Sequence, residues 1–220
     1  MNKKLYTEDG DIFIYNLKER IGSGGDGKIY LLNNDNCLKI FRSPHFEYAR
    51  NIIDIISNLN MDGIYRIYNL LYNNKREFIG YEMKYYQKED IDILTMPIDY
   101  TIDNLIKLYN LADIFGKYNI VMHDLLCINI ILNSDGITVI DADGYYFDKY
   151  GTKSHNKSNV NSLFRDLYKK SLEYNHNIIS RDLTDNINDL FAGGNVERTY
   201  KKLIKYKYPI DYLRKNNNML

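Results

Sequence analysis

The sequence contains few of the residues that stabilise exported or metal-stapled proteins. Only two of its 220 residues are cysteines, Cys37 and Cys127, and both lie in apolar runs. Two cysteines cannot build a disulfide framework, and no Cys/His spacing resembles a zinc site. The first 14 residues lack the long apolar stretch of a signal peptide. We therefore expect a reducing, cytoplasmic setting.

Long apolar runs and an excess of charge are also missing. No run of about 18 apolar residues is present, so no membrane span is expected. Lysine plus arginine and aspartate plus glutamate both number 29, which gives a formal net charge of zero. A neutral chain offers no electrostatic reason for binding nucleic acid or an anionic membrane, and we expect neither partner.

The first 86 residues have the pattern of an antiparallel sheet. Apolar residues make up 45 % of the chain, which is enough for the core of one domain or of two tightly joined lobes. Apolar and β-branched segments bounded by polar turns predict five strands, and apolar residues at helical spacing predict one helix. The strands are expected over residues 11–20, 28–32, 37–41, 65–72 and 77–86, with the helix over 46–59. This order predicts a five-stranded antiparallel sheet with one helix packed on it.

The pattern becomes mainly helical after about residue 90. Helices are expected over residues 101–118, 159–173 and 195–206, two short strands over 130–132 and 138–140, and a loop over 148–158. We therefore predict an α+β protein with two lobes, residues 1–86 and residues 87–220, that form one domain.

A glycine-rich segment lies between the first two predicted strands. Residues 21–29 read I-G-S-G-G-D-G-K-I and fit the pattern G-x-G-x-x-G-x-V, with isoleucine in the last place. Glycines let the backbone turn sharply and approach phosphate oxygens closely. A dinucleotide-binding fingerprint would open a helix, whereas a β-branched strand follows here. The segment predicts a hairpin tip that binds nucleotide phosphates, the alternative being an ordinary glycine-rich turn; the expected contacts are Ile21, Gly22, Ser23, Gly24, Gly27 and Ile29.

Lys39 lies twelve residues after Gly27, between apolar neighbours on a predicted strand. A lysine in such a place is costly unless it is paired, and a phosphate and a carboxylate would supply the pairing. The alternative is an edge-strand lysine that points to water. For the carboxylate we favour Glu47 over Asp54, because its longer side chain reaches farther. The alternative for Glu47 is a solvated acid at the start of the helix, which the helix dipole favours.

Three polar residues in the second half of the chain have a spacing that suits phosphoryl transfer. Asn129 follows Asp124 by five residues, and Asp141 follows Asn129 by twelve, at the end of a predicted strand. Phosphoryl transfer depends mostly on positioning and charge neutralisation. We predict that Asp124 accepts the proton of the substrate hydroxyl and that Asn129 and Asp141 hold Mg²⁺, which prefers oxygen ligands. Asp and Asn are common in turns, so one of these residues alone would not indicate a function. All three, however, follow the glycine segment and Lys39 in order.

These motifs together resemble the protein-kinase superfamily over about residues 15–170. Residues 121–132 resemble the signature H-R-D-L-x-x-x-N-I-L, and residues 37–40 resemble V-A-I-K. The segments G-Y-E-M at 80–83 and I-D-A-D at 140–143 resemble bacterial kinases of the helix-hairpin-helix-associated type. The resemblance implies a bilobal kinase-like fold with a reduced, mainly helical C-terminal lobe, and the substrates ATP and Mg²⁺. It places Met83 at the gatekeeper position and Lys84 to Tyr86 at the hinge that hydrogen-bonds adenine.

The chain departs from this signature at several positions. Met122 and His123 replace its histidine and arginine, Leu126 replaces the lysine of serine/threonine kinases, and Ala142-Asp143 replace F-G; no A-P-E motif follows. Three functions remain open. The chain is favoured as an atypical Ser/Thr protein kinase. The second possibility is a small-molecule kinase of the aminoglycoside or choline type, which also lacks that lysine but carries larger insertions. The third is a nucleotide-binding pseudokinase that acts as an interaction module.

Overall fold

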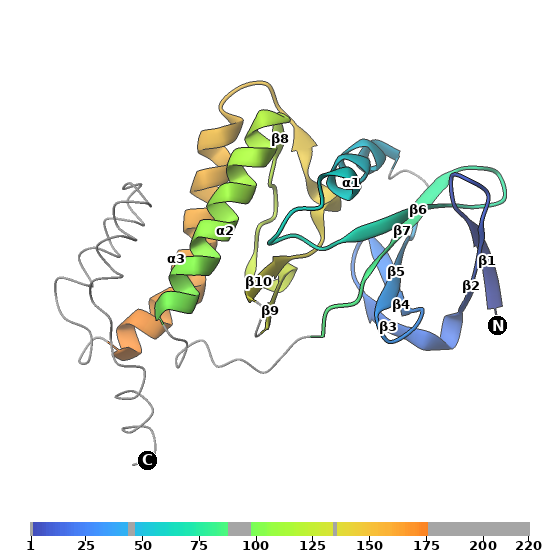
Figure 1. The fold of residues 1–220 in the computed structure, drawn as a ribbon, viewed down its shortest axis with the longest axis horizontal. Coiled ribbons are helices and arrows are strands. Elements are labelled where there is room, and N and C mark those ends of the chain that lie inside the picture. The colour runs from blue at the N-terminus through green and yellow to red at the C-terminus, as the bar shows by residue number, and fades with distance from the viewer. Residues whose placement is uncertain (1, 44–46, 88–97, 134–135, 176–220) are drawn as a thin grey trace, which may run out of the picture.

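The computed structural model describes residues 2–43, 47–87, 98–133 and 136–175. The protein has an α+β architecture, with a large antiparallel sheet in its N-terminal part and a mainly helical C-terminal part (Figure 1). The sheet has seven strands in the order β2-β1-β6-β7-β5-β4-β3. These strands are β1 (Asn2–Tyr6), β2 (Ile12–Asn16), β3 (Arg20–Ser23), β4 (Gly27–Leu31), β5 (Asn36–Phe41), β6 (Ile67–Tyr72) and β7 (Phe78–Lys84). Helix α1 (Glu47–Leu59) joins β5 to β6.

The prediction of five strands was wrong because the N-terminal segment adds a hairpin. The expected strand over residues 11–20 is divided: β2 ends at Asn16, whose side chain accepts a hydrogen bond from the backbone N–H of Lys18 and caps a short 3₁₀ turn. Residues 2–6, for which we predicted no element, form β1, which pairs with β2 along its length. Only Leu5 of β1 is buried, so the strand has no alternating apolar pattern to reveal it.

Both faces of the sheet carry buried apolar residues. Along β5, Cys37 and Phe41 belong to the main core beneath α1, and Lys39 points to the same side; Leu38 faces the opposite side. The opposite side has a smaller core formed by Leu5, Tyr15, Tyr30, Leu38 and Leu71. Tyr15 of β2 and Tyr30 of β4 are distant in strand order, yet their rings are 4.9 Å apart. The sheet therefore curls toward this second face.

The C-terminal part is built on two helices that pack side by side, α2 (Ile98–Lys117) and α3 (Thr152–Asn175). Two short strand pairs lie beside them: β9 (Ile130–Asn133) with β10 (Gly136–Val139), and β8 (Ile120–Val121) with β11 (Tyr146–Phe147). The expected helix over 101–118 and the expected pair of strands are confirmed. None of the helices in the described part of the chain is long and apolar enough to cross a membrane.

The predicted loop over residues 148–158 was wrong, because α3 already begins at Thr152. The hydroxyl of Thr152 donates to the backbone oxygen of Asp148, 2.6 Å away, at the start of the helix. The first turns are polar in sequence, but one of their polar residues, Asn156, is fully buried and hydrogen-bonded. A buried asparagine gives no apolar periodicity, which is why the pattern concealed the first two turns. The helix predicted over 195–206 lies outside the described residues.

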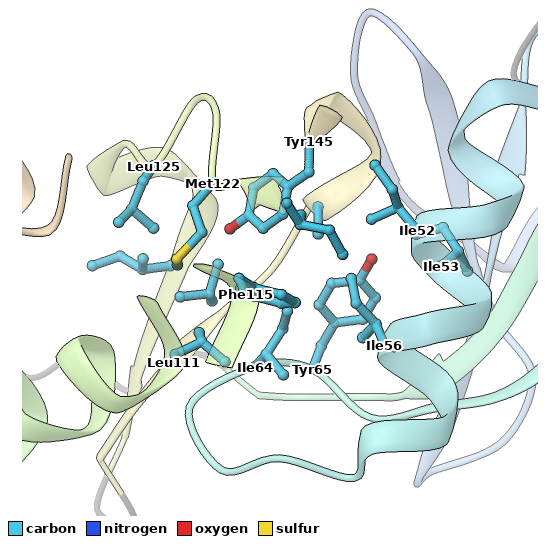
Figure 2. Packing of buried hydrophobic residues seen from close by; sticks show 14 of the residues in the cluster. Ile52, Ile53, Ile56, Ile64, Tyr65, Leu111, Phe115, Met122, Leu125 and Tyr145 are labelled. Atoms are coloured by element: carbon cyan, nitrogen blue, oxygen red, sulfur yellow. The ribbon is translucent and has the colours of Figure 1, made fainter. Parts of the chain in front are cut away.

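One apolar core joins the two parts of the molecule. Ile52 and Ile56 of α1 point toward Tyr65 and Tyr145, which lie between α1 and the helical part, and Ile53 belongs to the same core (Figure 2). A backbone hydrogen bond also joins the two parts: the N–H of Tyr65 donates to the oxygen of Val139 on β10, 2.9 Å away. This packing fixes the end of β10 against the sheet, and the polar residues described next are found at that junction.

Candidate functional site

Lys39 lies at the centre of an ion cluster between the sheet and the C-terminal part. Its ammonium group pairs with the carboxylates of Asp141 and Asp143, which follow β10 and are about a hundred residues away in the sequence. The lysine side chain is buried. Burial alone would lower the pKa of Lys39, but the charges of Asp143 and Asp141 outweigh it and raise the pKa. Lys39 is therefore protonated at neutral pH.

Asp143 is the buried partner in this cluster, with only 1 % of its surface exposed. One carboxylate oxygen accepts a hydrogen bond of 2.7 Å from the hydroxyl of Tyr81 on β7, and the other faces Lys39. Burial raises the pKa of Asp143 to about 6; Lys39 opposes this change and the nearby charge of Asp141 adds to it. Asp143 is thus a carboxyl group that is unusually ready to take up a proton.

Neither Glu47 nor Asp54, the two acids of α1 considered as partners of Lys39, is among its described contacts. Asp54 is exposed on α1, and its backbone oxygen accepts hydrogen bonds from Ser57 and Asn58. The side chain of Glu47 lies outside the described residues. Among the described residues Asp143 occupies the position that we expected an acid of the helix to take. The signal for it was its place two residues after Asp141 in I-D-A-D, a segment that resembles bacterial kinases and departs from D-F-G but that gave Asp143 no role of its own.

Asp124 and Asp141 both have left-handed backbone conformations, with φ of 53° and 68°. Such angles are uncommon for residues with a side chain, and aspartate tolerates them better than most. Strained backbone of this kind persists where the surroundings over-determine it, and it concentrates at functional sites. Asp124 is 58 % exposed, and its carboxylate lies 3.2 Å from Nδ1 of His123. It also lies against Gly144, in the short turn that begins at Ala142.

Asn129 links Asp124 to the segment that carries Asp141. Its side-chain amide nitrogen donates to the backbone oxygen of Asp124, 2.9 Å away. Its own backbone oxygen accepts from the N–H of Ile140, 2.8 Å away. Because the nitrogen of the amide is used, its oxygen remains as a ligand atom. The structure therefore brings together Lys39, Asp124, Asn129 and Asp141, the four residues to which the sequence assigned chemistry.

Helix α3 holds the segment before Asp124 in place. The side chain of Asn156 accepts from the N–H of Met122, 2.8 Å away, and donates to the oxygen of Ile120, 2.9 Å away. Asn159 donates to the oxygen of Met122, 3.0 Å away. Both backbone groups of Met122 are thus tied to the helix, and its side chain is buried in the core. The sequence placed Asn159 on this helix but gave no signal for Asn156.

The glycine-rich segment forms the predicted hairpin, with its tip between β3 and β4. Ile21, Gly22 and Ser23 lie on β3, and the N–H of Gly24 donates to the oxygen of Gly27, 2.9 Å away. Ile29 lies opposite Lys39 in the sheet, so the hairpin borders the ion cluster. The side chain of Arg42, which the sequence analysis missed, donates to the Gly24 oxygen and the Ser23 hydroxyl and so braces the tip.

Two glycines let neighbouring strands approach Lys39. A Cβ at Gly80 of β7 would lie 2.0 Å from the backbone oxygen of Lys39. This separation is too short for any side chain at position 80. A Cβ at Gly27 would lie 2.9 Å from the backbone oxygen of Ile40. The strand that carries Lys39 is therefore held between two close backbone contacts.

The predicted hinge follows the end of β7. Met83 is buried and pairs with Cys37 across the sheet, on the same face as Lys39. The backbone N–H of exposed Lys84 donates to the oxygen of Arg66, and the N–H of Tyr85 donates to the oxygen of Asp35. Tyr86 is half-buried, and its hydroxyl accepts from the N–H of Arg66. Two of the three hinge N–H groups are thus already bonded, and the adenine contact there stays a prediction.

The oxygen atoms at the site suit a metal that a phosphate chain helps to bind. No group of three or more His, Cys, Asp or Glu side chains is arranged for a metal ion within the described ranges. Mg²⁺, however, is usually held by one or two protein oxygens together with substrate phosphates and water. Asp141 is 39 % exposed and offers carboxylate oxygens, and Asn129, whose backbone oxygen accepts from the N–H of Ile140 next to Asp141, offers a side-chain amide oxygen. This donor set fits Mg²⁺ bound together with a nucleotide.

No protein-family model matches this chain, and no curated protein has a matching sequence. The function therefore has to be inferred from the residues and their geometry.

Proposed function

We propose that this protein is an ATP- and Mg²⁺-dependent phosphotransferase of bilobal, kinase-like architecture, with residues 1–86 and 87–220 as its lobes. The observation that supports this most is the pairing of Lys39 with Asp141, next to Asp124 and Asn129. Four residues chosen from the sequence for one reaction lie at one junction, although Lys39 is about a hundred residues away from Asp141 in the sequence. A set of ordinary turn residues would have no reason to meet there.

Each residue has a definable task in this reaction. The glycine hairpin and Lys39 bind the phosphates of ATP, since backbone N–H groups and a buried cation favour anions. Asp141 and the amide oxygen of Asn129 hold Mg²⁺, which when bound neutralises phosphate charge. Asp124 accepts the proton of the attacking hydroxyl. Asp143 pairs with Lys39 as well, so Lys39 would keep one carboxylate partner when Asp141 holds the metal.

The surroundings of Asp124 favour a protein as the phosphate acceptor. Its carboxylate is more than half exposed, and its neighbours Leu126 and Ile128 are exposed as well. In the described part of the chain no wall encloses this carboxylate as a small-molecule site would require. A serine or threonine hydroxyl on another protein could reach it from solvent. We therefore rank a protein kinase above a kinase of small metabolites.

The test uses the full chain with Mg²⁺ and ATP labelled on its γ-phosphate. Transfer to the protein itself or to a generic protein substrate is expected. Asp124→Asn should lower the rate by at least about 100-fold with nucleotide affinity retained, because it removes only the general base. Asp141→Asn should weaken Mg²⁺-dependent nucleotide binding. Asp62→Asn, an exposed aspartate in the turn after α1, is the matched control and should change neither.

Two outcomes would change the assignment. Absence of Mg²⁺-dependent nucleotide binding in calorimetry would refute phosphotransferase activity of any kind. Nucleotide binding with transfer only to a pool of metabolites would support the small-molecule kinase, and binding without any transfer would support the pseudokinase.

A further inference from the structure

A second pocket lies on the other face of the sheet. It has a volume of about 430 Å³, and strands β1, β2, β4 and β5 contribute to its lining. Along β4, Lys28 and Tyr30 point to one side while Ile29 points to the side of Lys39. The pocket is therefore separated from the ion cluster by the thickness of the sheet. It is not part of the site proposed for ATP.

Three cationic residues line this pocket: Lys3, Lys28 and Arg42. None of the described residues that line it is acidic. Lys3 and Lys28 form no ion pair with any residue in the described part of the chain. The whole protein has no net charge, so three uncompensated cations around one cavity are a local excess. Lys3 and Arg42 are exposed and Lys28 is half-buried, and like charges gathered around one cavity repel one another unless an anion joins them.

The rest of the lining is aromatic and apolar. Tyr15 and Tyr30 meet edge to face with their ring centroids 4.9 Å apart, and Ile40 lies beside Lys28 on the neighbouring strand. Apolar walls with a few convergent polar groups are the usual composition of a small-molecule site, and the volume falls in the usual range of about 300–1,000 Å³. Such walls suit a ligand with an aromatic or aliphatic body.

We propose that this pocket binds a small phosphorylated molecule with an aromatic or aliphatic body. Lys3, Lys28 and Arg42 contact its phosphate, and Tyr15, Tyr30 and Ile40 contact its body. Arg42 also braces the glycine hairpin through Ser23 and Gly24, so the pocket borders the tip of that hairpin. The proposal concerns binding only and does not depend on phosphotransferase activity.

Phenyl phosphate is the probe, because it combines a dianionic phosphate with an aromatic ring. Its binding to the full chain is measured by calorimetry and by the shifts of backbone amide signals in NMR. The double variant Lys3→Met/Lys28→Met keeps the apolar stems but removes two charges, and it should bind at least tenfold more weakly. Lys4→Met is the matched control: Lys4 is the exposed neighbour of Lys3 on β1, on the opposite face of that strand, and the variant should bind as the wild type does. Arg42 is left unchanged because it braces the hairpin.

Three comparisons decide the result. Phenol and inorganic phosphate should each bind at least tenfold more weakly than phenyl phosphate, since each lacks half of the ligand. Lys39→Met, which alters the ATP site, should leave the affinity for phenyl phosphate unchanged. Equal affinity of the wild type and the double variant, or signal shifts confined to residues around Asp141, would overturn the proposal. Binding of a phosphotyrosine peptide tenfold tighter than phenyl phosphate would overturn the small-molecule assignment in favour of a phosphoprotein.

Discussion

The ion cluster makes a strong prediction about stability, because one lysine neutralises two carboxylates. Replacing Lys39 with methionine keeps the apolar stem but removes the charge. Asp143, which is almost completely buried, would then face Asp141 without a cation. Removing one partner of a buried ion pair typically costs about 3–5 kcal/mol. Asp141 is partly exposed and water can solvate it, so most of this cost should come from Asp143.

The same geometry predicts that a second substitution will relieve the first. Asp143→Asn removes the buried negative charge but keeps an oxygen that can accept from Tyr81. On its own, Asp143→Asn should lower the free energy of unfolding by less than about 1 kcal/mol, or should raise it. The reason is that Lys39 keeps Asp141 as its partner. In the Lys39→Met background it should recover at least about 2 kcal/mol. The two residues would then show a large coupling energy in a double-mutant cycle.

Urea unfolding at pH 8, followed by circular dichroism, measures all four proteins of the cycle. Lys75→Met is the matched control, because Lys75 is exposed in the turn between β6 and β7. The reasoning is refuted if Lys39→Met costs no more than this control. It is also refuted if the effects of Lys39→Met and Asp143→Asn simply add, because the two charges would then not interact.

Three further predictions follow from the site and its supports. The pKa of Asp143 is raised to about 6, so the folded protein binds more protons than the unfolded chain between about pH 4 and 6; stability should fall as pH rises through this window, and Asp143→Asn should flatten the curve in urea titrations. Gly80→Ala should lower the free energy of unfolding by about 1–3 kcal/mol in urea titrations and displace Lys39. A Cβ at Gly25 meets no atom within 4 Å, so Gly25→Ala should be nearly neutral in the same titrations. Asn156→Ala removes the hydrogen-bond partner of the Met122 N–H and of the Ile120 oxygen and should cost about 1–3 kcal/mol in thermal or urea unfolding, while exposed Ser158→Ala should not.

The sequence predicted the parts of the site that local spacing encodes. The sequence placed Asn129 directly before one short strand and Asp141 at the end of the next, and in the structure Asn129 precedes β9 and Asp141 follows β10. Lys39 between apolar neighbours indicated a buried cation that needs a partner, and it has two. The roles of these residues in catalysis stay predictions, but their meeting could be expected because each motif fixes its own local geometry.

The parts that the sequence did not predict depend on distant contacts. The sequence assigned Asp143 no role, and only the packing of α1 and Tyr81 around it makes it a buried partner of Lys39. Strand β1 has one buried residue and gains its place from β2. The start of α3 is concealed because Asn156 is buried by hydrogen bonds rather than by apolar contact. No periodicity records such arrangements.

The shared core of the two parts has a consequence for how the protein responds to ligands. Lys39 belongs to the sheet and Asp141 to the helical part, and apolar packing between them is continuous. A ligand that contacts both residues binds only when both parts are folded and in register. At a hundred times its dissociation constant such a ligand adds about 2.7 kcal/mol to the stability of the folded protein. Melting temperature measured with and without a ligand should therefore report occupancy of this junction, whatever reaction takes place there.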